Sequence, residues 1–235
     1  TVAIRCPADE AARRLIKYSG VPIAAPSANI SGRPSPTRWE HVRDDLDGKI
    51  DAVIMGEPCI GGIESTVIDM TEELPMILRP GLITPERVSE ILGVPCDYDP
   101  AIKDNKEFVN AALLDPMTPK SELEKAAALV PRAPGMKYRH YAPKAQMQLY
   151  KGSLKNIKHA IDRDCAILEE AGCRVSCIIY EDAELAAKNL FSDLRKADEE
   201  GADVILASAL VGGESIAYSV MNRMLKSAGY NITEV

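Results

Sequence analysis

The sequence predicts an α/β protein with two parts of different architecture. Before residue 95, short strand patterns and turns are interspersed with two helix patterns, which indicates a mixed α/β domain. From Gln146 onward, apolar strand patterns alternate with segments of helix length, an order typical of βαβ units and of a small Rossmann-like parallel sheet. The stretch between them is polar and rich in proline. We therefore predict a domain at residues 1–96, a linker at 97–145 and a second domain at 146–235.

Two helices of the first part have clear start and stop signals. Residues 9–18 place apolar side chains on one face and are followed by Gly20. Thr84, Pro85 and Gly93 provide an N-cap, a first-turn proline and a C-terminal glycine for the second helix. Three strands are expected between these helices, joined in part by a Gly61–Gly62 turn, at residues 52–57, 65–70 and 75–81.

The second part alternates regularly. A capping box of Ser121 and Glu124 predicts a short helix that ends near Val130, before the alternation begins. Strands are expected at residues 146–151, 174–180 and 203–210, and helices at residues 154–171, 183–200 and 215–228. The Gly212–Gly213 pair lacks the spacing of a dinucleotide-binding loop, so we interpret it as a tight turn.

The composition is that of an ordinary globular protein. Hydrophobic residues make up 46% and charged residues 27% of the 235 positions, which excludes a wholly disordered, collagen-like or disulfide-scaffold chain. No apolar run approaches the length of a transmembrane helix, and the first ten residues lack the layout of a secretory signal. The net charge of −7 excludes nucleic-acid binding through overall charge but leaves room for a local basic cleft.

The six cysteines are scattered along the chain. They form no CxxC pair and have no histidine at ligand spacing, so we expect no metal site. We interpret them as small buried hydrophobic side chains, with a reactive or metal-binding thiol as the alternative. This usage indicates a reducing compartment, and we expect a cytoplasmic protein. The positions are Cys6, Cys59, Cys96, Cys165, Cys173 and Cys177.

The loop at residues 22–37, PIAAPSANISGRPSPT, carries the first candidate chemistry. Small hydroxyls, an amide, a glycine and Arg33 together suit an anionic phosphate chain. The alternative is a helix-capping loop, in which Ser35 or Thr37 caps a helix that runs through Val42. The two interpretations stay open at this point.

Two further segments fit phosphate or carboxylate binding. GIESTVIDM places Glu64, Ser65 and Thr66 where a strand begins, and ILRPG ends a strand with Arg79. An arginine there can bind an anion in bidentate fashion, or it can form an ordinary surface ion pair. RAPGMKYRHYAPKA, at 132–145, interleaves tyrosines with cations, which favours ligand contact over a plain surface connector.

Taken in order, APSANISGRPSPT, GIESTVID, ILRPG and PGMKYRHYAP resemble the two-domain threonylcarbamoyl-AMP synthase family. The resemblance implies the C-terminal portion of a YrdC-like domain, a linker whose PGMKYRHYAP segment acts as a lid, and a Rossmann-like domain. It implies synthesis of threonylcarbamoyl-AMP and pyrophosphate from L-threonine, bicarbonate or CO2, and ATP, with Mg2+. The product would serve threonylcarbamoyl-adenosine modification of tRNA, with tRNA-modification proteins or RNA as further partners and no membrane.

The resemblance also assigns site residues, with Tyr141 as a further linker candidate and no metal ligand. The residues implied for threonine are Arg5, Ala25 and Ser65. Those implied for the nucleotide are Thr1, Ser27, Ser35, Arg79, Tyr138 and His140. Arg33 would help to offset the charge of the triphosphate.

One departure from the family pattern concerns the start of the chain. The family carries a long segment before the position of Thr1, with a lysine-and-arginine motif that grips the triphosphate, and this sequence has none. We therefore expect a fragment with little or no synthase activity alone and with an unpaired sheet edge that favours association. One alternative function is a non-catalytic RNA-binding or assembly factor with a YrdC-like fold. A carbamoyl-transfer module of hydrogenase maturation fits less well, because the linker and the absence of zinc-finger cysteines argue against it.

Overall fold

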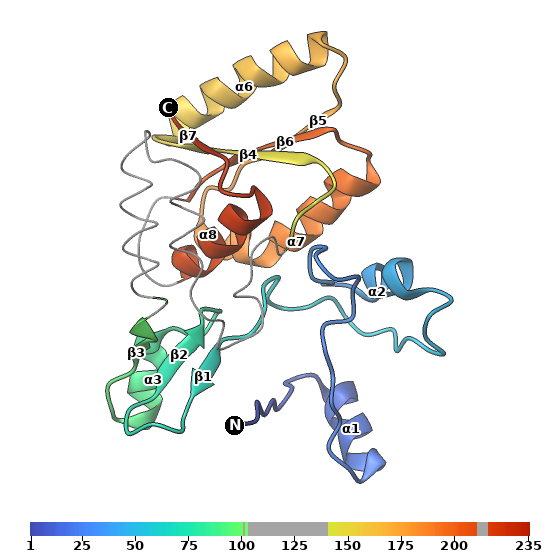
Figure 1. Ribbon diagram of the computed structural model, residues 1–235, viewed down its shortest axis with the longest axis vertical. Helices are drawn as coiled ribbons and strands as arrows, with labels where there is room; N and C mark the ends of the chain where they lie inside the picture. Colours follow the sequence, from blue (N-terminus) through green and yellow to red (C-terminus); the bar gives the residue numbers. More distant parts are fainter. Residues whose placement is uncertain (101, 103–140, 211–215) are drawn as a thin grey trace.

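The computed structural model describes residues 1–100, 102, 141–210 and 216–235. Within these ranges the chain forms one β-sheet in each part of the sequence and surrounds the sheets with helices (Figure 1). No helix in the described ranges is both long and apolar enough to cross a membrane. The helix expected at Ser121–Val130 and the Gly212–Gly213 turn lie outside the described residues.

The N-terminal part contains a small mixed sheet with the strand order β1-β2-β3. Strand β1 (Val67–Asp69) pairs antiparallel with β2 (Met76–Arg79), and β2 pairs parallel with β3 (Asp97–Tyr98). Strands β1 and β2 lie inside the predicted patterns at 65–70 and 75–81. The sequence does not predict β3, because two residues are too few to show an alternation.

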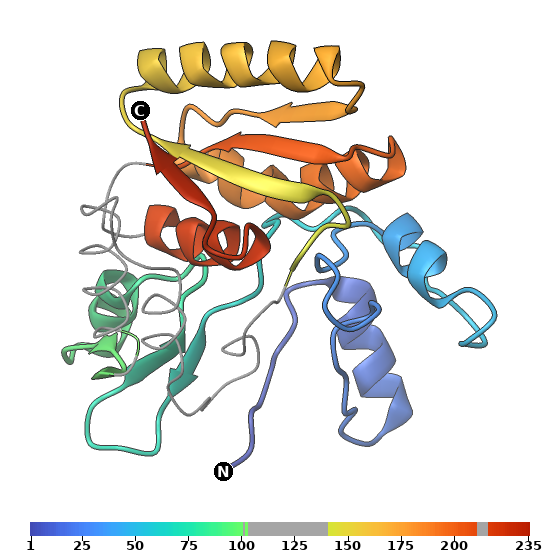
Figure 2. The same ribbon diagram turned by 45° about the horizontal axis from the view of Figure 1, so that its top comes forward.

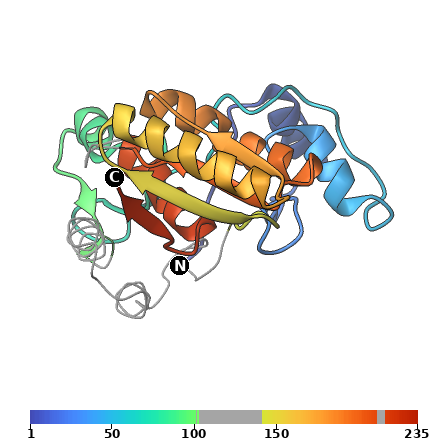
Figure 3. The same cartoon turned by 90° about the horizontal axis from the view of Figure 1, so that it is seen from above.

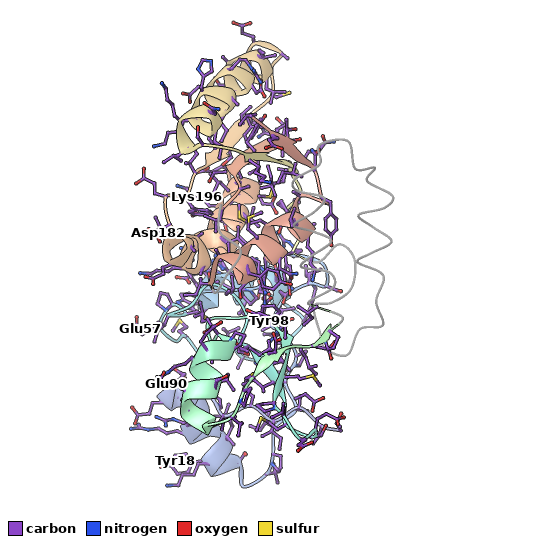
Figure 4. All side chains as sticks on the ribbon, turned by 90° about the vertical axis from the view of Figure 1, so that its left-hand side faces the viewer. Tyr18, Glu57, Glu90, Tyr98, Asp182 and Lys196 are labelled. Carbon is purple, nitrogen blue, oxygen red and sulfur yellow. The ribbon has the colours of Figure 1, made fainter. Side chains whose placement is uncertain are left out.

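Helix α1 (Glu10–Ser19) confirms the helix predicted at this position. Asp9 caps it by accepting a hydrogen bond from a first-turn amide, and Gly20 ends it with a φ of 68°. The apolar face of α1 lies open: Leu15 is 50% exposed, and Tyr18 points outward at the edge of the molecule (Figure 4). Amphipathic periodicity thus located the helix, although α1 buries none of its residues.

Helix α3 (Pro85–Leu92) also confirms its sequence signals. The Thr84 hydroxyl accepts a hydrogen bond from the Arg87 amide, Pro85 occupies the first turn, and Gly93 takes a φ of 70° after the last turn. These residues stabilise the helix because they bond or replace backbone amide and carbonyl groups at its ends, which have no partner within the helix.

One prediction for the N-terminal part is wrong, and one of its two open alternatives fails. The strand expected at residues 52–57 is absent. No described strand pairs with this segment, and most of its residues are exposed. Helix α2 (Trp39–Leu46) does follow the hydroxyl-rich loop, but its N-cap is Arg38, which makes no side-chain capping bond. Ser35 and Thr37 therefore do not act as caps, and the capping interpretation of this loop fails.

The C-terminal part confirms the predicted parallel sheet, with the strand order β5-β6-β4-β7. Its strands are β4 (Gln146–Lys151), β5 (Val175–Ile178), β6 (Val204–Ser208) and β7 (Ile232–Glu234). Its helices are α6 (Leu154–Glu170), α7 (Ala183–Glu199) and α8 (Ile216–Ser227). Strand β7 was not indicated by the sequence pattern, whereas the other elements match the predicted segments to within a few residues.

The helices cover the two faces of this sheet unequally. Helix α6 lies alone over β4, β5 and β6, where Ile157 and Ile161 are buried (Figure 3). Helices α7 and α8 pack against each other on the opposite face, around Leu190, Phe191 and Met224 (Figure 1). The main core therefore lies between the sheet and the α7–α8 pair.

Helices α7 and α8 also face the N-terminal part, so they lie between the two sheets (Figure 2). Ile63, from the loop before β1, is buried in the main core of the C-terminal part. The neighbouring Gly62 approaches α7 so closely that a Cβ atom there would lie 2.0 Å from the Lys188 carbonyl oxygen. This contact requires glycine and fixes the 61–66 loop against α7.

All six cysteines are free thiols. The interpretation as buried hydrophobic side chains is wrong, since Cys6, Cys59 and Cys177 are exposed and the other three are half-buried. The described residues contain no group of three histidine, cysteine, aspartate or glutamate side chains placed to hold a metal ion.

Candidate functional site

The Glu64 carboxylate is the meeting point of three segments. Ser35 Oγ donates a hydrogen bond to Glu64 Oε1 at 2.7 Å, and Arg223 Nε donates to Glu64 Oε2 at 3.2 Å. The Tyr141 hydroxyl also hydrogen-bonds to this carboxylate. The loop before α2, helix α8 and the end of the linker thus converge on one side chain of the loop before β1.

The pKa of the Glu64 carboxyl reflects this setting. Burial by itself favours the neutral acid, but the Arg223 guanidinium and the Ser35 hydrogen bond outweigh it and hold the pKa below its ordinary value. Glu64 is therefore a carboxylate at neutral pH. It accepts hydrogen bonds, and its single negative charge does not neutralise all of the surrounding positive charges.

Arg79 lies at the end of β2 beside this carboxylate. Its Nε and Nη2 atoms donate to the Ser65 carbonyl oxygen at 3.1 and 2.9 Å. Burial lowers the pKa of the Arg79 guanidinium, with Glu64 opposing the change and Arg223 and Arg5 adding to it, so these groups lie within electrostatic range of one another. An arginine keeps its charge even so, and the cluster is suited to an anion.

Helix α8 brings further positive charge to the same place. Lys226 is only 8% exposed, and burial together with Arg223 and Arg79 lowers its pKa to about 8 against the attraction of Glu64. Arg223 is 1% exposed, and its Nη2 atom has no hydrogen-bond partner among the described residues. Most charge in this buried cluster is therefore positive, with Glu64 as its acidic centre.

Tyr141 belongs to the C-terminal end of the predicted linker, where the described residues resume, and it lies against the same cluster. It takes a φ of 69°, stacks on Phe191 of α7 at a centroid distance of 5.0 Å, and its carbonyl accepts from Ser227 Oγ at 3.0 Å. Burial and Glu64 raise the pKa of its phenol to about 12. The Ala142 amide donates to the Gly32 carbonyl at 3.0 Å, so the linker end lies against the hydroxyl-rich loop.

A second buried ion pair lies on the other side of that loop. Arg195 of α7 binds Asp45 of α2 through Nη2–Oδ2 at 2.7 Å, with side chains 4% and 0% exposed. The same guanidinium donates to the Pro34 carbonyl at 3.0 and 2.6 Å, and Arg33 pairs with Asp45 at 2.5 Å. Burial by itself raises the pKa of Asp45, but the hydrogen bond and the charge of Arg195 outweigh burial. The pKa of this carboxyl is therefore below its ordinary value, and the group is ionised.

The structure brings together some of the residues implied by the sequence and not others. Ser35 is hydrogen-bonded to Glu64, and Arg79 binds the carbonyl of the next residue, Ser65. Arg5 and Glu64 both lie within electrostatic range of Arg79. Tyr138 and His140 lie outside the described residues. Thr1, Ala25 and Ser27 are exposed, and no described hydrogen bond ties them to this cluster.

Sequence reasoning missed the part that α7 and α8 contribute. It placed Glu64 at the start of a strand without a role, and it gave no role to Arg195, Arg223 or Lys226. An arginine inside an otherwise apolar helix face was the available signal, because a buried guanidinium requires a partner. Arg33, which the resemblance places near the triphosphate, pairs with Asp45 in this structure.

Two family profiles match the chain. Residues 1–81 match the family described as "Telomere recombination", which is that of Sua5, YciO and YrdC. Residues 83–229 match the family described as "Threonylcarbamoyl-AMP synthase, C-terminal domain". Together these matches confirm the predicted fold class, a YrdC-like mixed α/β part followed by a parallel-sheet domain.

Curated relatives carry the same order of parts. The chain is 39% identical to the threonylcarbamoyl-AMP synthase of Pyrococcus abyssi, over 100% of this chain and 66% of the relative. It is 36% identical to that of Bacillus subtilis, over 97% and 63%. For the Schizosaccharomyces pombe enzyme the identity is 34%, over 97% and 57%. The chain thus spans somewhat less than two thirds of the length of these relatives.

Solved structures agree with this assignment. The crystal structure of P. abyssi Sua5 complexed with L-threonine is 38% identical and superposes with a TM-score of 0.78, covering 98% of this chain and 65% of the other. A second structure of that protein, in which a neighbouring histidine and tyrosine are replaced by alanine, gives a TM-score of 0.77 at 36% identity. The chain belongs to the two-domain threonylcarbamoyl-AMP synthase family, with a YrdC-like part followed by the C-terminal domain of that family.

Proposed function

We propose that this chain carries the threonine- and nucleotide-facing part of an L-threonylcarbamoyladenylate synthase. The observation that supports the proposal most is the convergence of Ser35, Arg223 and Tyr141 on the Glu64 carboxylate. Arg79 lies within electrostatic range of the same group. The reaction would join L-threonine, bicarbonate or CO2, and ATP to give threonylcarbamoyl-AMP and pyrophosphate. The adenylate would then serve threonylcarbamoyl-adenosine formation in tRNA, in the cytoplasm, with tRNA-modification proteins as partners.

Two bonds form in this reaction. The threonine amine attacks the carbon of CO2 and loses a proton, which gives an N-carboxylate. An oxygen of that carboxylate attacks the α-phosphorus of ATP, and the bond to the β-phosphate oxygen breaks as pyrophosphate leaves. The protein contributes positioning and charge neutralisation without forming a covalent bond of its own.

Each assigned residue has a part in that positioning. Arg5 would pair with the threonine carboxylate, Ala25 would line the pocket, and Ser65 would bind threonine beside Arg79. The nucleotide would meet Thr1, Ser27, Ser35, Arg79, Tyr138 and His140. The phosphates carry several negative charges, so the guanidinium of Arg79 and the surrounding cations would stabilise them.

The linker would close over the site and exclude water from the unstable intermediates. His140–Tyr141 is the only His-Tyr pair in the sequence, and a neighbouring histidine and tyrosine are replaced in a solved P. abyssi Sua5 variant. Tyr141 is buried against Phe191 and bonded to Glu64. These facts support the linker end as part of the site.

Mg2+ belongs to the proposal as a companion of the triphosphate. The described residues hold no cluster of acidic, histidine or cysteine side chains that fits a metal ion. We therefore assign no protein ligand to Mg2+, and no step above depends on one.

The test compares two proteins. One is the 235-residue chain, and the other is the same chain extended at Thr1 with the preceding segment of the Pyrococcus abyssi relative. We expect threonine-dependent pyrophosphate release, with ATP and bicarbonate, from the extended protein, and the 235-residue chain is assayed beside it. Release that does not require threonine, from either protein, contradicts the proposal.

The alternative function gives a different pattern. A non-catalytic RNA-binding or assembly factor would bind tRNA without consuming ATP. Tight tRNA binding by the extended protein, with no pyrophosphate release and no threonine binding by calorimetry, would replace the synthase proposal.

A further inference from the structure

We propose that Arg195 and Arg223 are positioning residues, which hold residues 30–37 of the hydroxyl-rich loop (residues 22–37) in the shape that the site requires. Both arginines come from the C-terminal domain, on α7 and α8, whereas the loop belongs to the YrdC-like part. This inference rests on the proposed function for its effect on ligand binding. It gives the C-terminal domain a role that fold similarity alone does not supply.

Arg195 holds the loop directly. Its Nε and Nη2 atoms donate to the Pro34 carbonyl at 3.0 and 2.6 Å, and its Nη2 and Nη1 atoms donate to Asp45 at 2.7 and 3.3 Å. Asp45 in turn binds Arg33 and accepts a hydrogen bond from the Ile30 amide at 3.3 Å. The Arg195 guanidinium thus binds the loop backbone at Pro34. It also binds the Asp45 carboxylate, which in turn holds Ile30 and Arg33 of the loop.

Arg223 holds the loop through Glu64. Its Nε donates to Glu64 Oε2 at 3.2 Å, and its Nη1 donates to the Ser219 carbonyl at 3.1 Å, which orients the guanidinium. The second oxygen of Glu64 accepts from Ser35 at 2.7 Å. Nearby, Ser219 Oγ donates to the Gly81 carbonyl at 2.9 Å, so α8 also holds the turn after Arg79.

The three consecutive residues Arg33, Pro34 and Ser35 are therefore each tied to an interface group. Arg33 binds Asp45, Pro34 binds Arg195, and Ser35 binds Glu64. The loop has no sheet or helix bonds of its own that would set its shape. Local bonds of the Arg33 and Thr37 amides and the bond from Ala142 to Gly32 contribute to its conformation. The two guanidiniums behind the loop hold the Pro34 carbonyl and, through Asp45 and Glu64, its side chains.

Physical cost supports a placing role over a purely stabilising one. Two buried ion pairs are expensive to desolvate, and apolar side chains of similar volume often stabilise an interface as well or better. Bidentate guanidinium bonds, in contrast, fix a carbonyl and a carboxylate at defined distances and angles. A site that must present a hydroxyl to a nucleotide needs such fixed geometry.

The experiment uses the extended protein with Arg195→Met, Arg223→Met and the matched lysine substitutions. Lys196→Met is the control, since Lys196 lies next to Arg195 on α7 but points outward and pairs with the exposed Glu200 (Figure 4). Hydrogen exchange is measured at the Ile30, Arg33 and Thr37 amides, which are hydrogen-bonded in the folded loop. Calorimetry measures L-threonine and ATP affinity.

We expect both methionine variants to raise exchange at these amides and to weaken ATP binding by roughly tenfold or more, because a misplaced binding group loses a charge-assisted bond. The lysine variants keep the positive charge but lose the bidentate guanidinium. Their exchange rates and ATP affinities should therefore lie between those of the wild type and the methionine variants. Lys196→Met should match wild type in both measurements.

Three results overturn the inference. Exchange at the loop amides that stays at the wild-type rate shows that the arginines do not hold the loop. Faster exchange with unchanged ATP and threonine affinity shows that the clamp has no positioning role. A wild-type extended protein that binds neither ligand refutes the proposed function and the positioning role together, and only in that case do both fail. Should the methionine variants not fold, the lysine variants decide by the same criteria.

Discussion

Ser35 donates a hydrogen bond to Glu64 at 2.7 Å, although 29 positions separate them in the sequence. This bond joins the hydroxyl-rich loop to the loop before β1. Arg223 of the C-terminal domain binds the other oxygen of the same carboxylate. The two domains therefore share one half-buried acidic group, and the experiments below ask what it contributes.

Removal of this carboxylate should be costly for stability. Glu64→Ala leaves the buried Arg223 without its partner, and loss of one member of a buried ion pair costs about 3–5 kcal/mol. Urea unfolding of the chain should show this loss as a lower midpoint. Glu90→Ala on α3 removes an exposed carboxylate whose partner Arg87 is also exposed, so it should change stability by less than about 1 kcal/mol. Equal effects of the two substitutions would contradict the account of Glu64.

The close approach at Gly62 predicts a second destabilising substitution. Gly62→Ala would place a Cβ atom 2.0 Å from the Lys188 carbonyl oxygen and 2.7 Å from that of Ala187, so the loop or α7 must shift. We expect a loss of about 1–3 kcal/mol in the free energy of unfolding. Gly56→Ala serves as the control, since a Cβ at Gly56 meets nothing within 4 Å. A neutral Gly62→Ala would mean that the two parts are not packed as described.

Stability should fall in mildly acidic solution because of His41. Burial, Arg195 and Arg38 lower the pKa of this imidazole from 6.5 to about 4, and its Nδ1 accepts a hydrogen bond from the Thr37 amide. Between pH 6.5 and 4 the unfolded chain binds a proton that the folded chain does not, so the free energy of unfolding decreases as the pH falls.

Denaturant midpoints measured from pH 7 to pH 4.5 check this expectation. His41→Asn should reduce the pH dependence in that window, whereas His159→Asn, at an exposed position of α6, should leave it as in wild type. A wild-type midpoint that stays constant from pH 6.5 to 4.5 would rule out a buried neutral His41.

Much of the fold could be predicted from local signals. Asp9, Gly20, Thr84 and Gly93 provide caps whose physics acts within one turn, so both helices could be located. The prediction of a strand at residues 52–57 was wrong, because β-propensity does not show whether a partner strand is present.

Only part of the candidate site could be predicted from the sequence. Hydroxyls and arginines in loops carry a chemical signal, and Ser35 and Arg79 do lie together. The pairing of Glu64 with Arg223, 159 positions away, depends on how two domains pack, which no local pattern encodes. The helix-cap interpretation of Ser35 failed for the same reason, since a distant carboxylate binds the hydroxyl instead.

The proposed synthase activity predicts loss of function at Ser35. Ser35→Ala removes a hydroxyl that the proposal places on the nucleotide, so kcat/KM for ATP in the extended protein should fall by roughly tenfold. Thr71→Ala is a matched control, because it removes another hydroxyl bonded to a carboxylate at 2.7 Å, on the β1–β2 turn. If both variants keep full pyrophosphate release, Ser35 has no role at the nucleotide.

The central claim is that the threonine and nucleotide sites meet at the Glu64 cluster, between the YrdC-like part and α8. A crystal structure of the extended protein with L-threonine and ATP tests it most directly. We expect the amino-acid carboxylate beside Arg5 and Ser65, and nucleotide phosphates within hydrogen-bond distance of Ser35 or Arg79. Both ligands bound on a different face, with Ser35 still bonded only to Glu64, would contradict the account.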